Sequence, residues 1–312
     1  VEVSDTVTFP RKKRANVVYN INVGDPLKIN TVNYNFPDSS PEIEEYFLKF
    51  DRKIRPGTNF DIVALENFRT NLSNEYRNNG FYYFSKQLIS FKIDTIGRYQ
   101  NAILYVNFNP NINPKVYKQW KINNVYIHND YDPNLTMQNL QSYNSMLDTS
   151  LYYHEDKYPY YFIIKDETII KPKHIANELY VFPDSLYKLS ETKSTYSHLS
   201  KFKIYKLTNV TFAESIGDTN EYYLDCIVQL TPDKLKPVVF DIEATNTSVS
   251  VGGAGNAMFS HKNLFKGGEV FDIKLQLSLE KQKVADSTVK LLSFNTQEYN
   301  IDTRLTIPRI LI

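Results

Sequence analysis

The most regular pattern of hydrophobic and polar positions lies in EVFDIKLQLSLE, residues 269–280. Every second residue is apolar, so the apolar side chains share one face of a strand and the polar ones the other. The alternation returns in residues 299–307, and runs of this length match a tilted transmembrane β-strand. A half-buried strand of a soluble sandwich has the same pattern. The polar face carries charges along its whole length, which favours the membrane structure. The expected lipid-facing residues are Phe271, Ile273, Leu275, Leu277, Leu279, Ile301, Leu305 and Ile307.

Upstream, the spacing of apolar residues predicts alternating strands and helices. A strand over 26–36 is followed by a helix from Pro41 and by a second helix over about 61–79. Gly80 is expected to end the second helix in a left-handed cap. Two strands follow, over 81–94 and 101–109. The residues expected on the buried stripe of the second helix are Ile62, Leu65, Phe68, Leu72 and Tyr76.

This order of elements recurs further along the chain. The first strand of the series contains KINTV, and KINNV stands at residues 121–125. Helices are predicted from Pro172 and from about Leu186, with strands over 202–212 and 221–231. The sequence therefore predicts an internal repeat of an α+β module.

The repeat divides the chain into four expected parts. Residues 25–113 and 114–232 are the two modules, the second with a polar insertion near 129–165. Residues 1–24 are expected to be the closing strand of a preceding module, and residues 233–312 to hold membrane strands. The chain has no initiator Met and ends in IPRILI, so we expect it to be part of a longer protein.

Glycine is unevenly distributed. The chain has 10 glycines, and Gly252, Gly253, Gly255, Gly267 and Gly268 fall within residues 251–280. We expect a glycine-rich loop before the alternating strand, where glycine lets strands kink and twist near a barrel seam.

Composition narrows the class of protein. A net charge of +1 provides no field that favours nucleic acid. The 24 Tyr and 19 Phe favour strands. Cys226 is the single cysteine, which excludes an intramolecular disulfide; its neighbours YYLDCIVQL predict a buried strand position. No run of 18 apolar residues is present, so no helical membrane span is expected.

No catalytic motif is found, neither GxSxG nor HExxH, so neither an enzyme nor a cofactor is expected. His128, Asp130 and Asp132 alternate in HNDYDP and could converge on a cation, although a solvated turn fits this composition better. We expect no metal site. His174 and His198 lie on predicted helices and are interpreted as ordinary surface or boundary residues.

Several motifs resemble those of a known family. The strand–helix–helix–strand–strand modules, with GFYYF (80–84) and LSKFKIYKLTNVTF (199–212), look like POTRA domains. NLFKGGE followed by the alternating FDIKLQLSLE (263–280) is similar to the second barrel strand of the BamA/TamA outer-membrane assembly superfamily. FNTQEYNIDTRLTIPRIL (294–311) resembles its Bacteroidetes TamL branch. The resemblance implies α+β POTRA modules followed by antiparallel transmembrane β-barrel strands, here an incomplete barrel.

The resemblance also points to a gate strand at 238–246. In this family the first barrel strand pairs weakly and can accept an incoming strand by β-augmentation. A plain interior strand is the alternative. POTRA edges are a second expected docking surface, with the strand over 101–109 as one candidate. The expected client-binding residues are Val239, Phe240, Asp241, Ile242, Glu243, Ala244 and Thr245.

The implied function is non-enzymatic insertion of unfolded β-barrel clients into the outer membrane, with the modules in the periplasm. The resemblance implies a TamB-like partner anchored in the inner membrane, and contact with outer-membrane lipid. Three alternatives stay open: a BamA subunit with assembly lipoproteins, a soluble β-rich adhesin or carbohydrate-binding protein, and a two-partner secretion pore.

Overall fold

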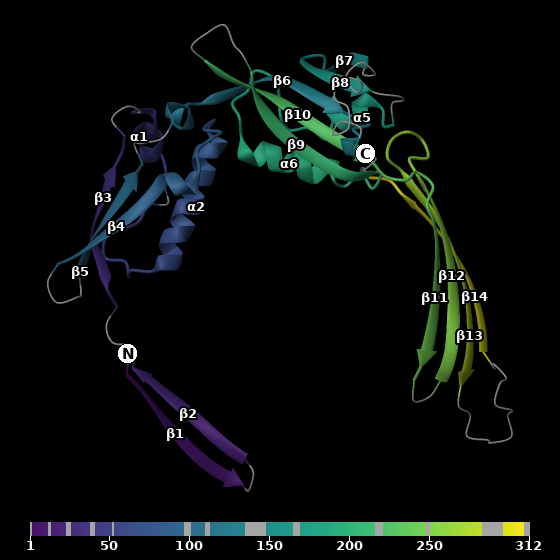
Figure 1. Cartoon of the computed structure of the whole chain (residues 1–312), viewed down its shortest axis with the longest axis horizontal. Helices are drawn as coiled ribbons and strands as arrows, with labels where there is room; N and C mark the ends of the chain where they lie inside the picture. Colours follow the sequence, from purple (N-terminus) through teal and green to yellow (C-terminus); the bar gives the residue numbers. More distant parts are fainter. Residues whose placement is uncertain are drawn as a thin grey trace. The chain divides into compact units, whose positions relative to one another are not determined.

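The computed structural model describes most of the chain and divides it into two compact units, Val1–Lys118 and Gln119–Ile312. Each unit is a mixture of sheets and helices in which sheets predominate (Figure 1). The described residues are 2–11, 14–22, 26–37, 41–51, 53–96, 101–109, 113–134, 148–164, 169–215, 221–247, 250–282 and 296–308.

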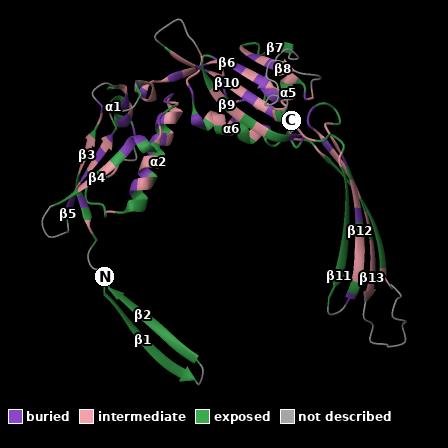
Figure 2. Cartoon of the chain, viewed as in Figure 1, coloured by how far each residue is buried: buried purple, intermediate pink, exposed green. Residues whose placement is uncertain are grey.

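The first unit opens with a hairpin of β1 (Glu2–Arg11) and β2 (Arg14–Asn22). The two strands are antiparallel, with Val3 opposite Ile21 and Val7 opposite Val17. The expected closing strand over 1–24 is therefore a pair of strands, and every described residue in it is exposed (Figure 2).

The first α+β module follows. Its three-stranded sheet has the order β3-β5-β4, with β3 parallel and β4 antiparallel to β5. The strand over 101–109 is thus central, and its prediction as a free edge was wrong; β3 and β4 form the edges. The elements are β3 (Lys28–Asn35), α1 (Pro41–Leu48), α2 (Ile62–Asn78), η1 (Lys86–Leu88), β4 (Ile89–Ile96), β5 (Asn101–Phe108) and η2 (Pro114–Tyr117).

Helix α2 forms where its sequence predicts it. The Asp61 carboxylate accepts the N–H of Val63 at 2.8 Å and caps the first turn. Gly80 follows the last turn with φ +95°, a conformation that glycine adopts without strain. Four of the five predicted stripe residues are buried, but Ile62, the first residue of the helix, is 71% exposed.

The predicted strand over 81–94 begins later than expected. Phe81 and Phe84 are buried anchors of a turn, and β4 starts only at Ile89. Tyr76 packs against both rings, edge-on to Phe81 with centroids 5.4 Å apart and tilted against Phe84 with centroids 4.4 Å apart. Aromatic residues, which are common in strands, here pack a loop against α2. This tertiary contact cannot be predicted from the β-propensity of the residues.

The second unit contains a larger sheet with the order β7-β8-β6-β10-β9. β7 and β8 come from the predicted insertion and extend the sheet beyond β6. The helix predicted from Pro172 is only five residues long. The elements are β6 (Trp120–His128), β7 (Asp148–His154), β8 (Tyr158–Ile164), α5 (Pro172–Ala176), α6 (Leu189–Leu199), β9 (Tyr205–Ser215) and β10 (Tyr222–Pro232).

The two modules share backbone geometry as well as element order. The N–H of Gly57 donates to the carbonyl of Ile29 at 2.7 Å, and the N–H of Asp184 donates to the carbonyl of Ile122 at 2.9 Å. Both donors have positive φ, +87° and +62°. Ile29 and Ile122 occupy the same position in KINTV and KINNV, so the short sequence echo corresponds to an equivalent strand and an equivalent turn.

A four-stranded antiparallel sheet ends the second unit, in the order β11-β12-β13-β14. Of the five glycines expected in a loop, Gly267 and Gly268 do lie in the turn before β13, but Gly252, Gly253 and Gly255 belong to the strand β12, which pairs with β13 along its whole length. The glycines of β12 hid the alternation of apolar and polar residues, because a residue without a side chain counts as neither apolar nor polar. The strands are β11 (Val238–Asn246), β12 (Ser250–Lys262), β13 (Val270–Gln282) and β14 (Thr296–Thr306).

Candidate functional site

The predicted gate strand, β11, is an edge strand. Among the described residues it pairs only with β12, from Val238 opposite Phe259 to Asn246 opposite Val251. All nine of its residues are exposed, and the exposed fraction reaches 92% at Ile242. The other side of β11 therefore presents a row of backbone groups to which another strand can bond.

Hydrogen bonds at both ends of β11 determine which backbone groups face that open edge. The N–H of Ser260 donates to the carbonyl of Pro237 at 3.1 Å, and the N–H of Thr247 donates to the carbonyl of Ser250 at 2.8 Å. Bonded and non-bonded pairs alternate in an antiparallel ladder, so the odd-numbered residues of 239–245 bond to β12. The groups that face the open edge are those of Phe240, Ile242 and Ala244.

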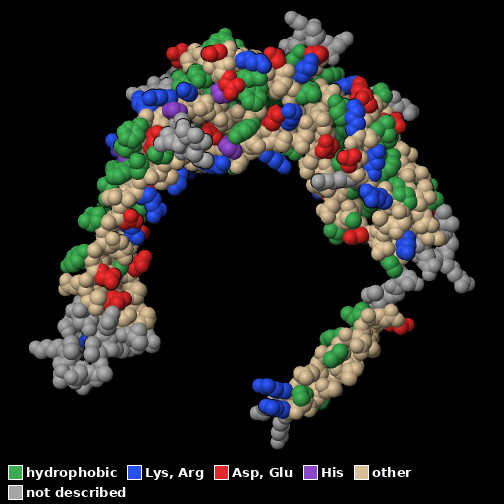
Figure 3. All heavy atoms as spheres, turned by 180° about the vertical axis from the view of Figure 1, so that it is seen from behind, with side chains coloured by type: hydrophobic (Ala, Val, Ile, Leu, Met, Phe, Trp, Pro, Cys, Tyr) green, Lys and Arg blue, Asp and Glu red, His purple; other side chains and the backbone are tan. Residues whose placement is uncertain are grey.

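The strand register builds one apolar face across all four strands. One row runs Phe240, Ala257, Leu275 and Ile301 from β11 to β14; the next runs Ile242, Gly255, Leu277 and Tyr299. These rows line a shallow groove of about 520 Å³ whose floor is formed by the small residues of β12. Figure 3 shows hydrophobic side chains gathered along this sheet.

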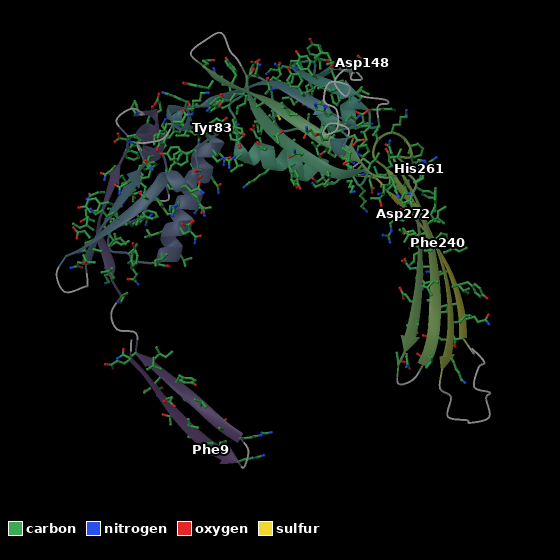
Figure 4. The ribbon with its side chains drawn as sticks, viewed as in Figure 1. Phe9, Tyr83, Asp148, Phe240, His261 and Asp272 are labelled. Atoms are coloured by element: carbon green, nitrogen blue, oxygen red, sulfur yellow. The ribbon has the colours of Figure 1, made fainter. Side chains whose placement is uncertain are left out.

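The opposite face of the same sheet is polar. Asp241, Asn256, Gln276 and Asn300 form a row at the same level as the apolar rows. Nearer the turn between β12 and β13, the hydroxyl of Ser260 donates to the Asp272 carboxylate at 2.5 Å. In Figure 4, His261 and Asp272 lie toward the end of the sheet where β12 turns into β13, and Phe240 lies farther from that turn.

The eight predicted lipid-facing residues all share the parity of the apolar face. Five of them, Leu275, Leu277, Ile301, Leu305 and Ile307, are exposed. Phe271, Ile273 and Leu279 are half-buried by their cross-strand neighbours. The structure thus places these residues together and leaves that face uncovered by any described residue.

The turn between β12 and β13 attaches the sheet to the second α+β module. The Asn263 amide donates to the carbonyl of Ile169 at 2.7 Å, and the N–H of Lys171 donates to the carbonyl of Lys266 at 3.2 Å. Gly268, with φ +86°, lies against the Phe202 ring. The NLFKGGE motif therefore forms a docking turn, and the strand after it, β13, is the third of this sheet and not the second that the resemblance implied.

Internal hydrogen bonds hold this turn in shape. The side-chain carbonyl of Asn263 accepts the N–H of Gly268 at 3.0 Å, and the Glu269 carboxylate accepts the N–H of Gly267 at 3.0 Å. The two adjacent glycines between Asn263 and Glu269 are the sequence signal that could have identified the turn. They leave room for a close approach and supply backbone donors.

Buried polar groups continue the connection into the module. The Asn129 amide donates to the carbonyl of Ile170 at 3.0 Å, and the Tyr205 hydroxyl donates to the Asn129 side-chain oxygen. Lys262 pairs with Asp233 at 2.6 Å, and this hydrogen bond lowers the pKa of the Asp233 carboxyl. The base of the sheet is thereby held by backbone, amide and ionic contacts together.

Within the described ranges, no three His, Cys, Asp or Glu side chains are placed to hold a metal ion. In HNDYDP, the Asp132 carboxylate accepts the N–H of Asn134 at 2.9 Å, a turn contact. His198 on α6 donates from Nδ1 to the carboxylate of Glu178, which lies in the turn after α5, at 2.9 Å.

No helix in the described part of the chain is both long enough and apolar enough to cross a membrane.

No protein-family model matches the chain, and no curated protein matches it. Among solved structures, it is similar to CdiB from Acinetobacter baumannii, with 10% identity, a TM-score of 0.35, and coverage of 83% of this chain and 39% of that one.

Two further solved structures are BamA proteins of Haemophilus. BamA from Haemophilus ducreyi lacking POTRA domains 1–3 has 8% identity and a TM-score of 0.40, over 90% of this chain and 58% of that one. BamA POTRA3–5 from Haemophilus influenzae has 10% identity and a TM-score of 0.25, over 68% and 99%. The chain spans less than two thirds of the length of CdiB and of the Haemophilus ducreyi protein.

Proposed function

We propose that this chain is part of a non-enzymatic outer-membrane assembly factor that receives unfolded β-barrel clients and helps them insert. The single observation that carries the proposal is the sheet β11–β14, with one apolar face, one charged face and an open edge at β11. Strands of 9 to 13 residues match the span of a tilted membrane strand.

The apolar face suits lipid better than the interior of a soluble sandwich. A sandwich core would bury Phe240 and Ile301, which here are 75% and 71% exposed. Contiguous exposed apolar surface of this kind is typical of sites that contact membranes or other proteins. This exposure counts against the soluble adhesin alternative.

Client binding is assigned to β11 and to the edges of the α+β modules. An incoming strand would bond to the outward backbone groups of Phe240, Ile242 and Ala244, while Val239, Asp241, Glu243 and Thr245 keep β11 paired with β12. Insertion then needs no nucleotide, because each added strand satisfies its backbone polar groups within the barrel.

We place the protein in the outer membrane with its α+β modules in the periplasm. The motif resemblance favours the TamL branch over a BamA subunit, and with it a TamB-like partner over assembly lipoproteins. Outer-membrane lipid would contact the apolar face.

A proline in β11 tests the proposal. Ile242→Pro removes an outward N–H without removing a bond to β12, so the sheet should persist. Ile242→Val keeps the N–H and is the matched control. We expect vesicles carrying the wild-type protein or the valine variant to accelerate folding of a urea-unfolded outer-membrane barrel. The proline variant should lose that acceleration, and full activity in it would contradict the proposal.

A further inference from the structure

We propose that the outer edge of β3 is a second strand-binding site, which takes an extended client segment parallel to β3. The inference rests on the proposed function, because it names which module edge binds clients and in which direction. The observation behind it is that the second module carries a strand at the equivalent edge, whereas none of the residues described in the first module fills that place.

The equivalence of the two edges follows from backbone contacts. The N–H of Ile29 donates to the carbonyl of Thr58 at 2.9 Å, and the N–H of Ile122 donates to the carbonyl of Ser185 at 2.8 Å. In both modules the turn between the helices thus covers the first part of the strand. The second part of the strand, residues 32–36 in the first module, lies beyond that turn.

In the second module, β8 occupies the second part of the edge. It runs parallel to β6, with Tyr126 opposite Tyr161 and His128 opposite Ile163. The backbone bond continues past β6, where the N–H of Asn129 donates to the carbonyl of Ile163 at 3.3 Å. The chain therefore contains an example of the strand addition that we infer at β3.

Burial shows what the added strand does for the core. Val125 and Ile127 on β6 are 0% exposed. Val181, in the connection between α5 and α6, is 3% exposed. Counting from the shared hydrogen bonds, the equivalent residues of the first module are Val32, Tyr34 and Ile54. All three are only partly buried. An added strand would bury apolar surface at β3 that is already buried at β6.

The edge also determines the chemistry of its partner. Tyr160 and Phe162 of β8 point into the core and are 0% exposed, and Tyr160 donates to the carbonyl of Val181 at 3.2 Å. On the other face of β3, the exposed Asn35 amide donates to the Asn107 side chain at 2.6 Å. The site therefore fits an extended segment with large apolar residues at alternate positions and polar ones between them, as in a barrel strand.

A register-specific disulfide tests the site in the full chain. The probe is a synthetic peptide with the β8 sequence, flanked by lysines for solubility, with cysteine in place of Ile163. By equivalence with His128, Asn35 should lie opposite that cysteine, within disulfide reach of it. The protein variant is Asn35→Cys. The native Cys226 is fully buried, so it does not compete.

Two controls define the expected result. A peptide with cysteine in place of Tyr158 should react with Asn35→Cys about tenfold more slowly, because only paired residues are held at bonding distance. Asn209→Cys, an exposed asparagine on the edge strand β9, should show no preference between the peptides. Equal rates for both peptides at position 35, or a preference for the Tyr158 peptide as in an antiparallel strand, would overturn the inference.

The outcome is separable from that of the proposed function. The folding assay with Ile242→Pro reports on β11 alone. Failure of the disulfide test with normal behaviour of the β11 variants would remove β3 as a site and leave the assembly proposal standing.

Discussion

Gly268 lies against the ring of Phe202 with no space for a side chain between them. A Cβ at position 268 would lie 2.6 Å from Cδ1 of Phe202, and the φ of +86° is itself strained for any other residue. Since Phe202 belongs to the second α+β module and Gly268 to the turn between β12 and β13, this contact joins the two parts.

Gly268→Ala should therefore loosen the docking turn. We expect a cost of about 1–3 kcal/mol from steric clash in addition to the backbone strain. Hydrogen exchange of the Lys171 N–H, which bonds to Lys266, reports on the turn directly. Gly57→Ala is the control, because Gly57 has φ +87° but no atom within 4 Å of an added Cβ. It should leave exchange at Lys171 unchanged, and equal acceleration by both variants would contradict the docking role.

Glycines within β12 should differ in their tolerance of a methyl group. A Cβ at Gly252 would lie 2.6 Å from the carbonyl oxygen of Leu279, whereas at Gly255 it would meet nothing within 4 Å. We expect Gly252→Ala to destabilise the β12–β13 pairing by about 1–3 kcal/mol and Gly255→Ala to have little effect. Protease resistance of β13 measures the difference, and equal resistance of the two variants would exclude the close approach.

Acid should destabilise the second α+β module through His128. Burial lowers the pKa of this imidazole, and the charge of Asp130 opposes part of the shift. The folded state thus favours the neutral ring, and the unfolded chain binds more protons. Above a pH of about 6.5, the pKa of an unfolded histidine, the ring is neutral in both states and costs no stability. As the pH falls below that value, the unfolded chain gains the proton more readily, so the free energy of unfolding decreases.

Urea unfolding followed by the fluorescence of Trp120 at neutral and mildly acidic pH measures this effect. The single tryptophan is 1% exposed on the same strand as His128. His128→Gln removes the titrating group and should flatten the pH dependence. An unchanged slope in the variant would assign the acid sensitivity to other groups.

Cys226 should be unreactive in the folded protein. It is 0% exposed at the centre of β10, and burial raises the pKa of its thiol, so little thiolate is available. A thiol reagent at pH 8 should label it only after urea unfolding. Rapid labelling without urea would show that β10 opens readily. Experiments with introduced cysteines would then need Cys226 to be replaced.

The sequence predicted most of the regular elements, because their periodicity reflects burial directly. The alternation in β13 corresponds to its two faces, and the stripe on α2 corresponds to its buried side except at Ile62. β11 was located at its observed bounds. The KINTV and KINNV echo corresponds to equivalent hydrogen bonds, since the same strand must receive the same turn.

Other features depend on contacts between distant residues, which local patterns do not encode. Phe81 and Phe84 look like strand residues but pack a turn against Tyr76. β12 was missed because glycine contributes to neither face. The order of strands in the first sheet, which makes β5 central, comes from the parallel pairing of β3, a long-range contact. The docking of Asn263 onto Ile169 joins residues 94 positions apart.

The most direct test of the account is the environment of alternate residues along β13 in vesicles of outer-membrane lipid. Single cysteines at positions 273 to 278 can carry a spin label, with Cys226 buried and silent. If the apolar face contacts lipid, labels at Ile273, Leu275 and Leu277 are accessible to oxygen in the bilayer. Labels at Lys274, Gln276 and Ser278 should instead be accessible to a water-soluble relaxant. Accessibility to water at all six positions, without alternation, would contradict the claim that this face of the sheet contacts lipid.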